Sequence, residues 1–98
     1  MEVCFANDDL DRLESDPTYT AGFSGAIVKA FRKRMQQIRA AVDERDFYAL
    51  KSLHFEKLAG ARQHQHSMRL NEQYRLVIEL EGHGSRKALR VVGIEDYH

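Results

Sequence analysis

The sequence has no long apolar run, only one cysteine and no excess of charge of either sign. No stretch of about 18 or more apolar residues occurs, so we expect no membrane-spanning helix. The first residues are acidic and lack the basic and apolar leader of a secretion signal, and we therefore expect a cytoplasmic protein. Cys4 has no partner for an internal disulfide and no neighbouring base, and its apolar neighbours favour a small buried side chain.

The charges balance overall but are unevenly distributed. The 15 Lys and Arg residues offset 15 Asp and Glu residues, which argues against a general polyanion-binding surface. Residues 1–16 nevertheless hold six acids against a single arginine, and all five histidines come after residue 53. This asymmetry is compatible with a local anion-binding face. A solvated surface of mixed charge is the alternative.

The length and composition fit a single globular domain. A chain of 98 residues, of which 43% are apolar and 31% charged, can form one modest core. No repeat, linker or low-complexity tract divides it. We therefore expect one domain that spans residues 1–98.

The first residues predict a brief strand and a short helix. Residues 3–6 form an apolar run, which favours a strand. Asn7 or Asp8 is placed to cap the following helix, whose first turn contains acids that suit the helix dipole. Pro17 ends this helix because proline cannot continue the hydrogen-bond ladder.

A longer helix is predicted to begin after its cap, Ser24, and to extend to about Arg45. Its buried face is defined by apolar residues spaced four, four, three and four positions apart: Ile27, Phe31, Met35, Ile38 and Val42. Its other side is largely basic or polar: Lys29, Arg32, Lys33, Gln36 and Arg39. That side could contact nucleic acid or an acidic peptide, although a solvated helix face is the more common explanation.

The second half predicts a short helical turn and then three strands. The turn spans residues 46–53 and points its large apolar residues inward: Phe47, Leu50 and Leu53. Gly60 marks a bend, and the strands follow at residues 66–71, 74–81 and 87–95. The last strand has apolar residues on both faces, so we place it inside the sheet. This order predicts an α+β fold, with two N-terminal helices packed on one face of a small, mostly antiparallel twisted sheet.

Alternation within the strands assigns their faces. In the first strand of the hairpin, Met68 and Leu70 share one face, and the polar residues Ser67 and Arg69 share the other. In the second strand the inward residues are Tyr74, Leu76, Ile78 and Leu80. If the two strands pair, Arg75 lies near Asn71 across the turn.

Three segments in the second half are the most distinctive. They read LHFEKLAGAR (53–62), SMRLNEQYRLVIELE (67–81) and IEDYH (94–98). In this order they resemble the HigB branch of the RelE superfamily of bacterial toxins, with its Leu-His pair, Lys-Leu-x-Gly-x-Arg loop, Ser-x-Arg-x-Asn-x-x-Tyr/Trp-Arg strand pair and closing Glu-Asp-Tyr-His. The sequence departs from that pattern at Ala61, Gln63 and His64, and His66 stands where an aromatic residue is common.

The resemblance implies a RelE-like fold, an activity and a partner. The fold is a small sheet backed by two N-terminal helices. The activity is ribosome-dependent cleavage of messenger RNA in the decoding site, which contains 16S rRNA. The partner is a HigA-like antitoxin with a helix-turn-helix, and the toxin contacts operator DNA only through this complex.

The same segments contain the groups needed to cleave RNA by its own 2′-hydroxyl. The reaction requires removal of the 2′ proton, neutralisation of charge on the phosphorane and protonation of the leaving 5′ oxygen. We predict that His54 and His98 transfer protons, because the pKa of histidine lies near neutrality. Tyr97 would stack on or orient a base, and Asp96 would orient a histidine or contact the RNA. Which histidine is the base stays open.

Basic and amide side chains in these segments suit the RNA itself, because arginine and lysine bind phosphate and asparagine can contact a base. The predicted RNA-binding residues are Lys57, Arg62, Arg69, Asn71 and Arg75. Each has a simpler explanation. Arg69 and Arg75 could have no role beyond ion pairs with Glu79 or Glu81. His54 could be an ordinary surface or core histidine.

Three other interpretations of the sequence are a metal site, a catalytically silent binding module and a free RNA-binding domain. His64 and His66 lie two residues apart, but they lack cysteine or acidic ligands at the spacing typical of zinc, so we expect neither a metal nor another cofactor. A catalytically silent module that keeps the fold and pairs with a regulator is the alternative to the ribonuclease. A free RNA-binding domain is less favoured, because the sequence shows no continuous basic surface.

Overall fold

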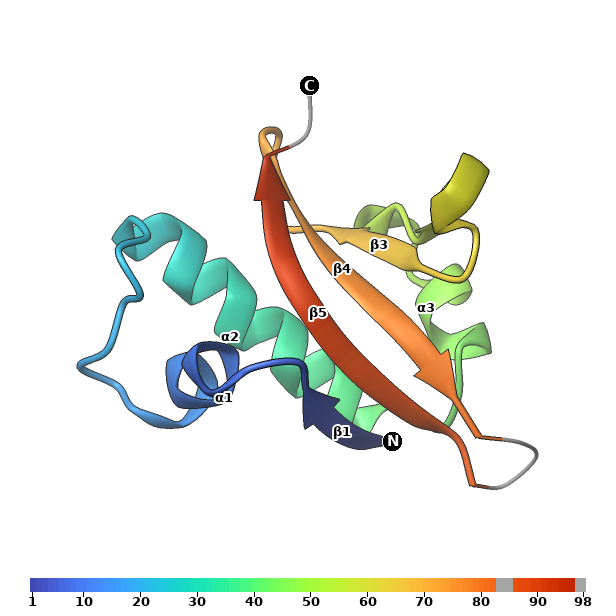
Figure 1. Ribbon diagram of the computed structural model, residues 1–98, viewed down its shortest axis with the longest axis horizontal. Coiled ribbons are helices and arrows are strands. Elements are labelled where there is room, and N and C mark those ends of the chain that lie inside the picture. Colours follow the sequence, from blue (N-terminus) through green and yellow to red (C-terminus); the bar gives the residue numbers. More distant parts are fainter. Residues whose placement is uncertain (83–85, 97–98) are drawn as a thin grey trace.

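The protein forms a twisted five-stranded sheet with helices on one face (Figure 1). A computed structural model describes residues 1–82 and 86–96. The strand order is β1-β5-β4-β3-β2, in which β1 runs parallel to β5 and all other neighbours are antiparallel. The strands are β1 (Glu2–Phe5), β2 (Glu56–Lys57), β3 (His66–Arg69), β4 (Tyr74–Glu81) and β5 (Ala88–Asp96). The predicted α+β class is confirmed.

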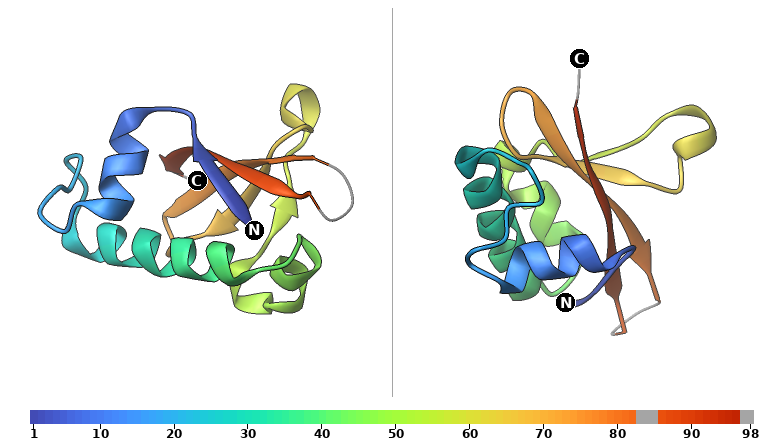
Figure 2. Two further views of the ribbon diagram at one scale, coloured as in Figure 1. Left: turned by 90° about the horizontal axis from the view of Figure 1, so that it is seen from below. Right: turned by 60° about the vertical axis from the view of Figure 1, so that its left-hand side comes forward.

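Three α-helices and a short 3-10 helix precede β2, and they lie on one side of the sheet (Figure 2). They are α1 (Asp8–Ser15), α2 (Gly25–Ala40), α3 (Arg45–Ala49) and η1 (Lys51–Leu53). The description of two N-terminal helices is therefore incomplete. A second 3-10 helix, η2 (Gly60–Arg62), projects from the opposite face, which we call the open face (Figure 2, right). None of the helices within the described ranges has the length and apolar character that a membrane crossing requires.

Helix α1 begins and ends as its sequence predicts. The Oδ1 atom of Asn7 accepts a hydrogen bond from the amide of Leu10 at 3.0 Å, which satisfies one of the unpaired donors of the first turn. Leu10 and Leu13 are buried against the core. The helix ends at Ser15, two residues before Pro17.

Helix α2 is shorter than predicted. Ser24 caps it, and four of the five expected apolar residues are buried, but the helix ends at Ala40 rather than near Arg45. The chain turns extended at Ala41, and the amide of Val42 donates to the carboxylate of Asp46 at 2.8 Å. Val42 is consequently 77% exposed, so its predicted place on the buried face was wrong.

The next segment is divided between α3 and η1. Phe47 and Leu53 are buried, as predicted. Leu50 lies between the two helices with φ −90° and ψ 88°, which breaks the helical spacing. It is 44% exposed, so the prediction that it faces inward was wrong.

Side-chain alternation in β1 places Cys4 on the exposed side of an edge strand. Val3 and Phe5 are partly buried and pack against the core, whereas Glu2 and Cys4 are exposed. The prediction of a buried Cys4 was wrong, because its apolar neighbours point to the other face of the strand.

The sheet holds the core between its inner face and the helices. β4 has the predicted bounds, and β5 lies between β1 and β4, which confirms its interior position. Core side chains from both strands meet those of α2: Leu76, Ile78, Leu89, Val91, Phe31, Met35 and Ile38. β3 stops at Arg69, before the predicted Asn71, and the register pairs Arg69 with Arg75.

Candidate functional site

A pocket of about 290 Å³ opens beside the β3–β4 turn, and four predicted site residues help to line it. Its lining residues are His54, Arg69, Asn71, Glu72 and Arg75. They come from the end of η1, from β3, from the turn and from β4. The structure thus brings one histidine and two arginines into one site, although His54 and Arg75 are 21 positions apart in the sequence.

His54 ends η1 in the left-handed conformation, with φ 46° and ψ 47°. Its amide donates to the carbonyl of Lys51 at 3.1 Å, which closes the 3-10 turn before the chain enters β2. Histidine is one of the few non-glycine residues enriched in this conformation. The exposed imidazole places Nε2 at 3.5 Å from Nη1 of Arg69. A group that can accept or donate a proton therefore lies directly beside a permanent cation.

Arg75 forms the floor of the site and is only 8% exposed. Its Nε donates to Oγ of Ser67 at 2.8 Å, and its Nη2 donates to the carbonyl of His54. The carboxylate of Glu56 lies 3.6 Å from the guanidinium. One buried cation thus ties the end of η1 to β2 and β3, which fixes the backbone that carries the His54 imidazole.

Ser67 supports the candidate site, although the sequence did not single it out. The alternation placed it on the polar face of the strand, yet it is only 1% exposed. It supports Arg75 from the neighbouring strand, since Ser67 pairs with Val77, two residues after Arg75. A serine set diagonally opposite an arginine in a predicted hairpin is the signal that could have identified this pair.

Asn71 holds the β3–β4 turn and places it beside the end of β5. Its Oδ1 accepts hydrogen bonds from the amides of Gln73 and Tyr74 at 2.8 and 2.7 Å. The side-chain amide of Gln73 donates to Oδ2 of Asp96 at 3.1 Å, and Tyr74 is the register partner of Asp96. The predicted catalytic residues Tyr97 and His98 follow directly in the chain and lie outside the described residues.

Arg62 lies over the open face, held by the end of β5. Its Nη1 and Nη2 bind the two carboxylate oxygens of Glu95 at 2.8 and 2.5 Å, and its Nε donates to Gln65 at 2.9 Å. The paired guanidinium holds the pKa of the Glu95 carboxyl below its usual value. Because Glu95 pairs with Arg75 in the strand register, Arg62 lies on the same face as the pocket floor.

Lys57 lies on the short edge strand β2, where it pairs with His66 and is exposed. The His66 ring stacks on Phe55, with 4.9 Å between ring centroids and a 6° interplanar angle. Burial lowers the pKa of His66, and the Lys57 ammonium lowers it further. His66 therefore fills the position of an aromatic residue, while Lys57 borders the site from β2 without lining the pocket.

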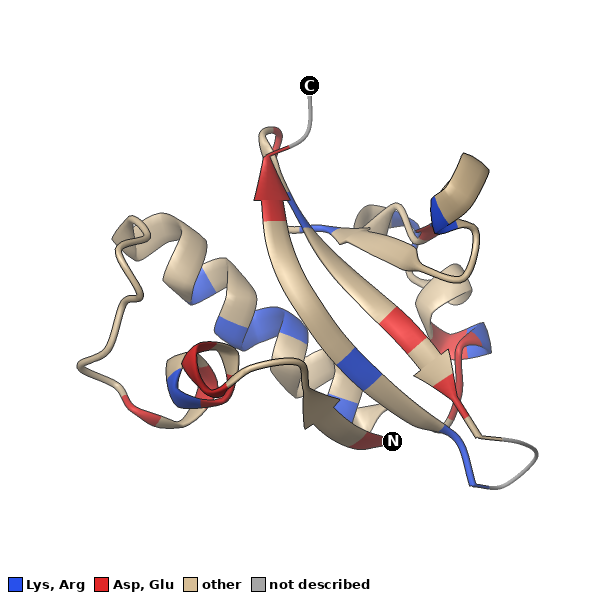
Figure 3. Ribbon diagram, viewed as in Figure 1, with Lys and Arg blue, Asp and Glu red and all other residues tan. Residues whose placement is uncertain are grey.

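Several charged residues of α1 and α2 make contacts away from this site, although Nε of Arg34 on α2 donates to the carbonyl of Arg69 at 2.7 Å. The acids of α1 lie apart from the β3–β4 turn and the end of β5 (Figure 3). Arg39 on α2 binds both carboxylate oxygens of Glu14 at 2.6 Å. Arg32 donates to the carbonyls of Leu13, Asp16 and Tyr19. These two members of the predicted basic face are structural, since they join α2 to α1 and its connector.

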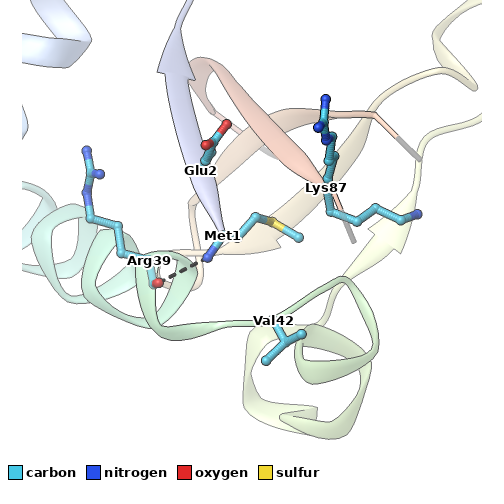
Figure 4. Close-up of a pocket in the computed structure, with 6 residues that line it drawn as sticks. Met1, Glu2, Arg39, Val42 and Lys87 are labelled. Atoms are coloured by element: carbon cyan, nitrogen blue, oxygen red, sulfur yellow. Dashed lines mark hydrogen bonds between the residues drawn. The ribbon is translucent and has the colours of Figure 1, made fainter. Parts of the chain in front are cut away.

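A larger pocket of about 760 Å³ surrounds the first residues of the chain (Figure 4). Met1, Arg39 and Lys87 are among its lining residues. The amino group of Met1 donates to the carbonyls of Arg39 and Ala41 at 3.2 and 2.6 Å, which satisfies acceptors at the end of α2. This pocket contains none of the predicted site residues, and the Met1 contacts in it stabilise the end of α2.

The comparisons with known proteins agree with the fold. Among solved structures, the chain resembles the YoeB/ParE toxin from Agrobacterium tumefaciens, with a TM-score of 0.63 and 18% identity over 100% of both chains. At this identity the likeness establishes the fold. No curated protein matches the chain. The model of a family described as the HigB-like RelE-like toxins of type II toxin–antitoxin systems matches residues 3–91. The chain therefore belongs to the HigB-like toxin family.

Proposed function

We propose that this toxin is a ribosome-dependent endoribonuclease that cleaves messenger RNA during translation. One observation carries the proposal: Nε2 of His54 lies 3.5 Å from Arg69, in a pocket whose floor is the buried Arg75. A proton-transfer group and phosphate ligands thus occupy one small site. Family membership supports the toxin role, and the pocket supports the chemistry.

The chemistry follows from the needs of phosphodiester cleavage. A base removes the proton from the 2′-hydroxyl, the 2′ oxygen bonds to phosphorus, and the bond to the 5′ oxygen breaks as an acid protonates that oxygen. His54 serves one proton step and His98 the other. Arg69 and Arg75 neutralise charge that develops on the phosphorane. Asp96 orients a histidine or contacts the RNA, and Tyr97 stacks on a base.

The remaining predicted contacts extend the RNA path away from the pocket. Arg62 and Lys57 flank the open face and β2, where they would bind neighbouring phosphates. The carbonyl oxygen of the Asn71 side chain is used by the turn, so its NH2 group is the part that would contact a messenger base. Binding to the ribosome is strongly electrostatic, and a protein with zero net charge gains no overall attraction to RNA. The acids of α1 lie apart from the site, so they need not face the ribosome and oppose binding there.

The proposed partners follow from the family and the proposed activity. The substrate is messenger RNA on the ribosome, at the decoding site of the 16S rRNA. The antitoxin is a helix-turn-helix protein of the HigA type, and operator DNA is contacted only through the complex. Such a toxin acts in the cytoplasm.

A catalytically silent binding module is the second candidate. It is favoured by one specific observation: the guanidinium fork of Arg62, a predicted phosphate ligand, is fully engaged by Glu95. Such a module would keep the fold and bind the antitoxin without cleaving RNA.

The test is mapping of messenger RNA 5′ ends in cells after brief induction of the toxin. Cells that express His98→Ala and His54→Asn, at matched protein levels, serve as controls. New cuts within translated reading frames that vanish in both variants support the ribonuclease. An absence of new cuts with soluble, folded wild-type toxin that still binds its antitoxin would overturn the proposal and favour the silent module.

A further inference from the structure

The loop of residues 58–65 is held on the open face by two glutamates of the sheet. Glu95 on β5 binds both terminal nitrogens of Arg62. Glu79 on β4 accepts a hydrogen bond from the Gln65 side chain at 2.9 Å and lies 3.7 Å from Nε2 of His64. The loop therefore rests on the sheet through carboxylates, although this face also carries the arginines of the pocket.

The Arg62–Glu95 contact occupies the pair of terminal nitrogens with which Arg62 could bind a phosphate end-on. Its Nη1 and Nη2 point to Glu95, and its Nε points to Gln65. A carboxylate and a phosphate both offer two oxygens to this fork, so they compete for the same geometry. Arg62 cannot bind RNA in this manner until Glu95 has released it.

The contact is also open to solvent and therefore accessible to a competing anion. The side chains of Arg62 and Glu95 are 45% and 44% exposed, so solvent screens their attraction. Gly60, with φ 67°, begins the 3-10 turn that carries Arg62, so the loop can change direction where a side chain would be strained. A phosphate that approaches the open face can replace the carboxylate without unfolding the sheet.

We propose that Glu95 is a specificity-determining residue that weakens binding of free RNA by occupying Arg62 as a phosphate mimic. The inference rests on the proposed function in one respect, namely that Arg62 is an RNA ligand. RNA that is not bound to the ribosome must displace Glu95 from Arg62 and must also approach the negative charge of this carboxylate. Messenger RNA in the decoding site is already held by the ribosome. Its other contacts can therefore compensate for the free energy needed to displace Glu95. Glu95 thereby restricts the toxin to ribosome-bound substrate.

The experiment measures binding of a single-stranded 2′-O-methyl RNA, which cannot be cleaved, to the purified toxin over a range of salt concentrations. Glu95→Gln keeps the side-chain size but removes the charge. We expect it to bind the RNA about tenfold more tightly at low salt, through one added charge-assisted contact. The logarithmic salt dependence should steepen by about 0.7, the increment for one more phosphate contact on a single strand.

Two controls assign the effect to Arg62. Glu81→Gln makes the same change of net charge at the far end of β4, opposite Ala88, and should alter the affinity less than twofold. Arg62→Ala combined with Glu95→Gln should lose the gain. The inference is overturned if Glu95→Gln binds no more tightly than wild type, if neither protein binds the RNA, or if the gain persists without Arg62.

This measurement is independent of the cleavage assay. A toxin that makes no cuts in cells but shows the Arg62-dependent gain retains the block on free-RNA binding by Glu95, but it loses the ribonuclease proposal and with it the restriction to ribosome-bound substrate. A toxin that cuts messenger RNA but shows no gain retains the ribonuclease and loses the role of Glu95. Thermal melting of each variant confirms that the fold is intact, as expected for an exposed pair.

Discussion

The guanidinium of Arg75 and the hydroxyl of Ser67 form a buried hydrogen bond of 2.8 Å across the β3–β4 pair. Arg75 also donates to the carbonyl of His54, so a single side chain joins the sheet to the segment that carries the imidazole. Arg75 is therefore a structural cation as well as a proposed phosphate ligand.

Arg75→Ala should therefore reduce stability as well as activity. We expect a loss of about 2–3 kcal/mol in the free energy of unfolding, because Ser67 and the His54 carbonyl lose a charged donor in a buried setting. Ser67→Ala should cost only about 1 kcal/mol, since Arg75 keeps its carbonyl partner. Urea denaturation measures both. A loss below about 0.5 kcal/mol for Arg75→Ala would contradict the structural role.

His54→Asn should separate catalysis from folding. Asparagine tolerates the left-handed backbone at φ 46°, so the end of η1 should keep its conformation and the melting temperature should barely change. The variant lacks the imidazole that the proposed mechanism uses for a proton step. We expect cleavage of ribosome-bound messenger RNA to fall by about 100-fold or more. Substantial residual cleavage by a folded variant would remove His54 from the proton steps.

The sequence predicted much of the fold because short-range patterns decide it. Helical spacing identified four buried residues of α2, of which Ile27 is the first and Ile38 the last. Strand alternation predicted the bounds of β4. The end of α2 depends instead on contacts from outside the helix. The Met1 amino group donates to two carbonyls at the helix end, and the Asp46 carboxylate accepts from the Val42 amide just beyond it. No local signal in the helix records these contacts, so its length was overestimated.

The sequence could predict the part of the site that the β3–β4 hairpin brings together. The predicted hairpin placed Arg75 near Asn71. In the structure Arg75 pairs with Arg69 in the register and lines the same pocket as Asn71. The Arg62–Glu95 contact joins residues 33 positions apart and depends on the path of an irregular loop. Motif resemblance could therefore name Arg62 as a ligand but could not indicate that a carboxylate already occupies it.

Arg32 offers a test of the connector between α1 and α2. Its guanidinium donates to the carbonyls of Leu13, Asp16 and Tyr19 at 2.8–3.2 Å. Arg32→Ala should lower the free energy of unfolding by about 2 kcal/mol, because these partly buried acceptors lose their donor. Lys29→Ala on the same helix should change it by less than about 0.5 kcal/mol. Equal effects of the two substitutions, measured by urea denaturation, would show that Arg32 acts only through charge.

His66→Phe should stabilise the protein, and increasingly so at acidic pH. The ring stacks on Phe55, and within the described part of the chain its buried Nδ1 has no hydrogen-bond partner. Phenylalanine keeps the stacking and removes this unpaired polar atom, so we expect a gain of about 1 kcal/mol at neutral pH.

The acid dependence follows from the pKa of His66. Burial and the Lys57 ammonium lower this pKa below 6.5, its ordinary value, while the Glu44 carboxylate opposes the shift. Below the ordinary value the unfolded chain binds a proton that the native state does not, so native stability falls as the pH falls towards the lowered pKa. The His66→Phe variant has no imidazole at this position and does not lose stability in this way. Its stability advantage over wild type, measured by urea denaturation at about pH 7.5 and about pH 5.5, should therefore grow on acidification. The other four histidines are common to both proteins, so an advantage that stays constant or shrinks would mean that His66 is readily protonated in the native state.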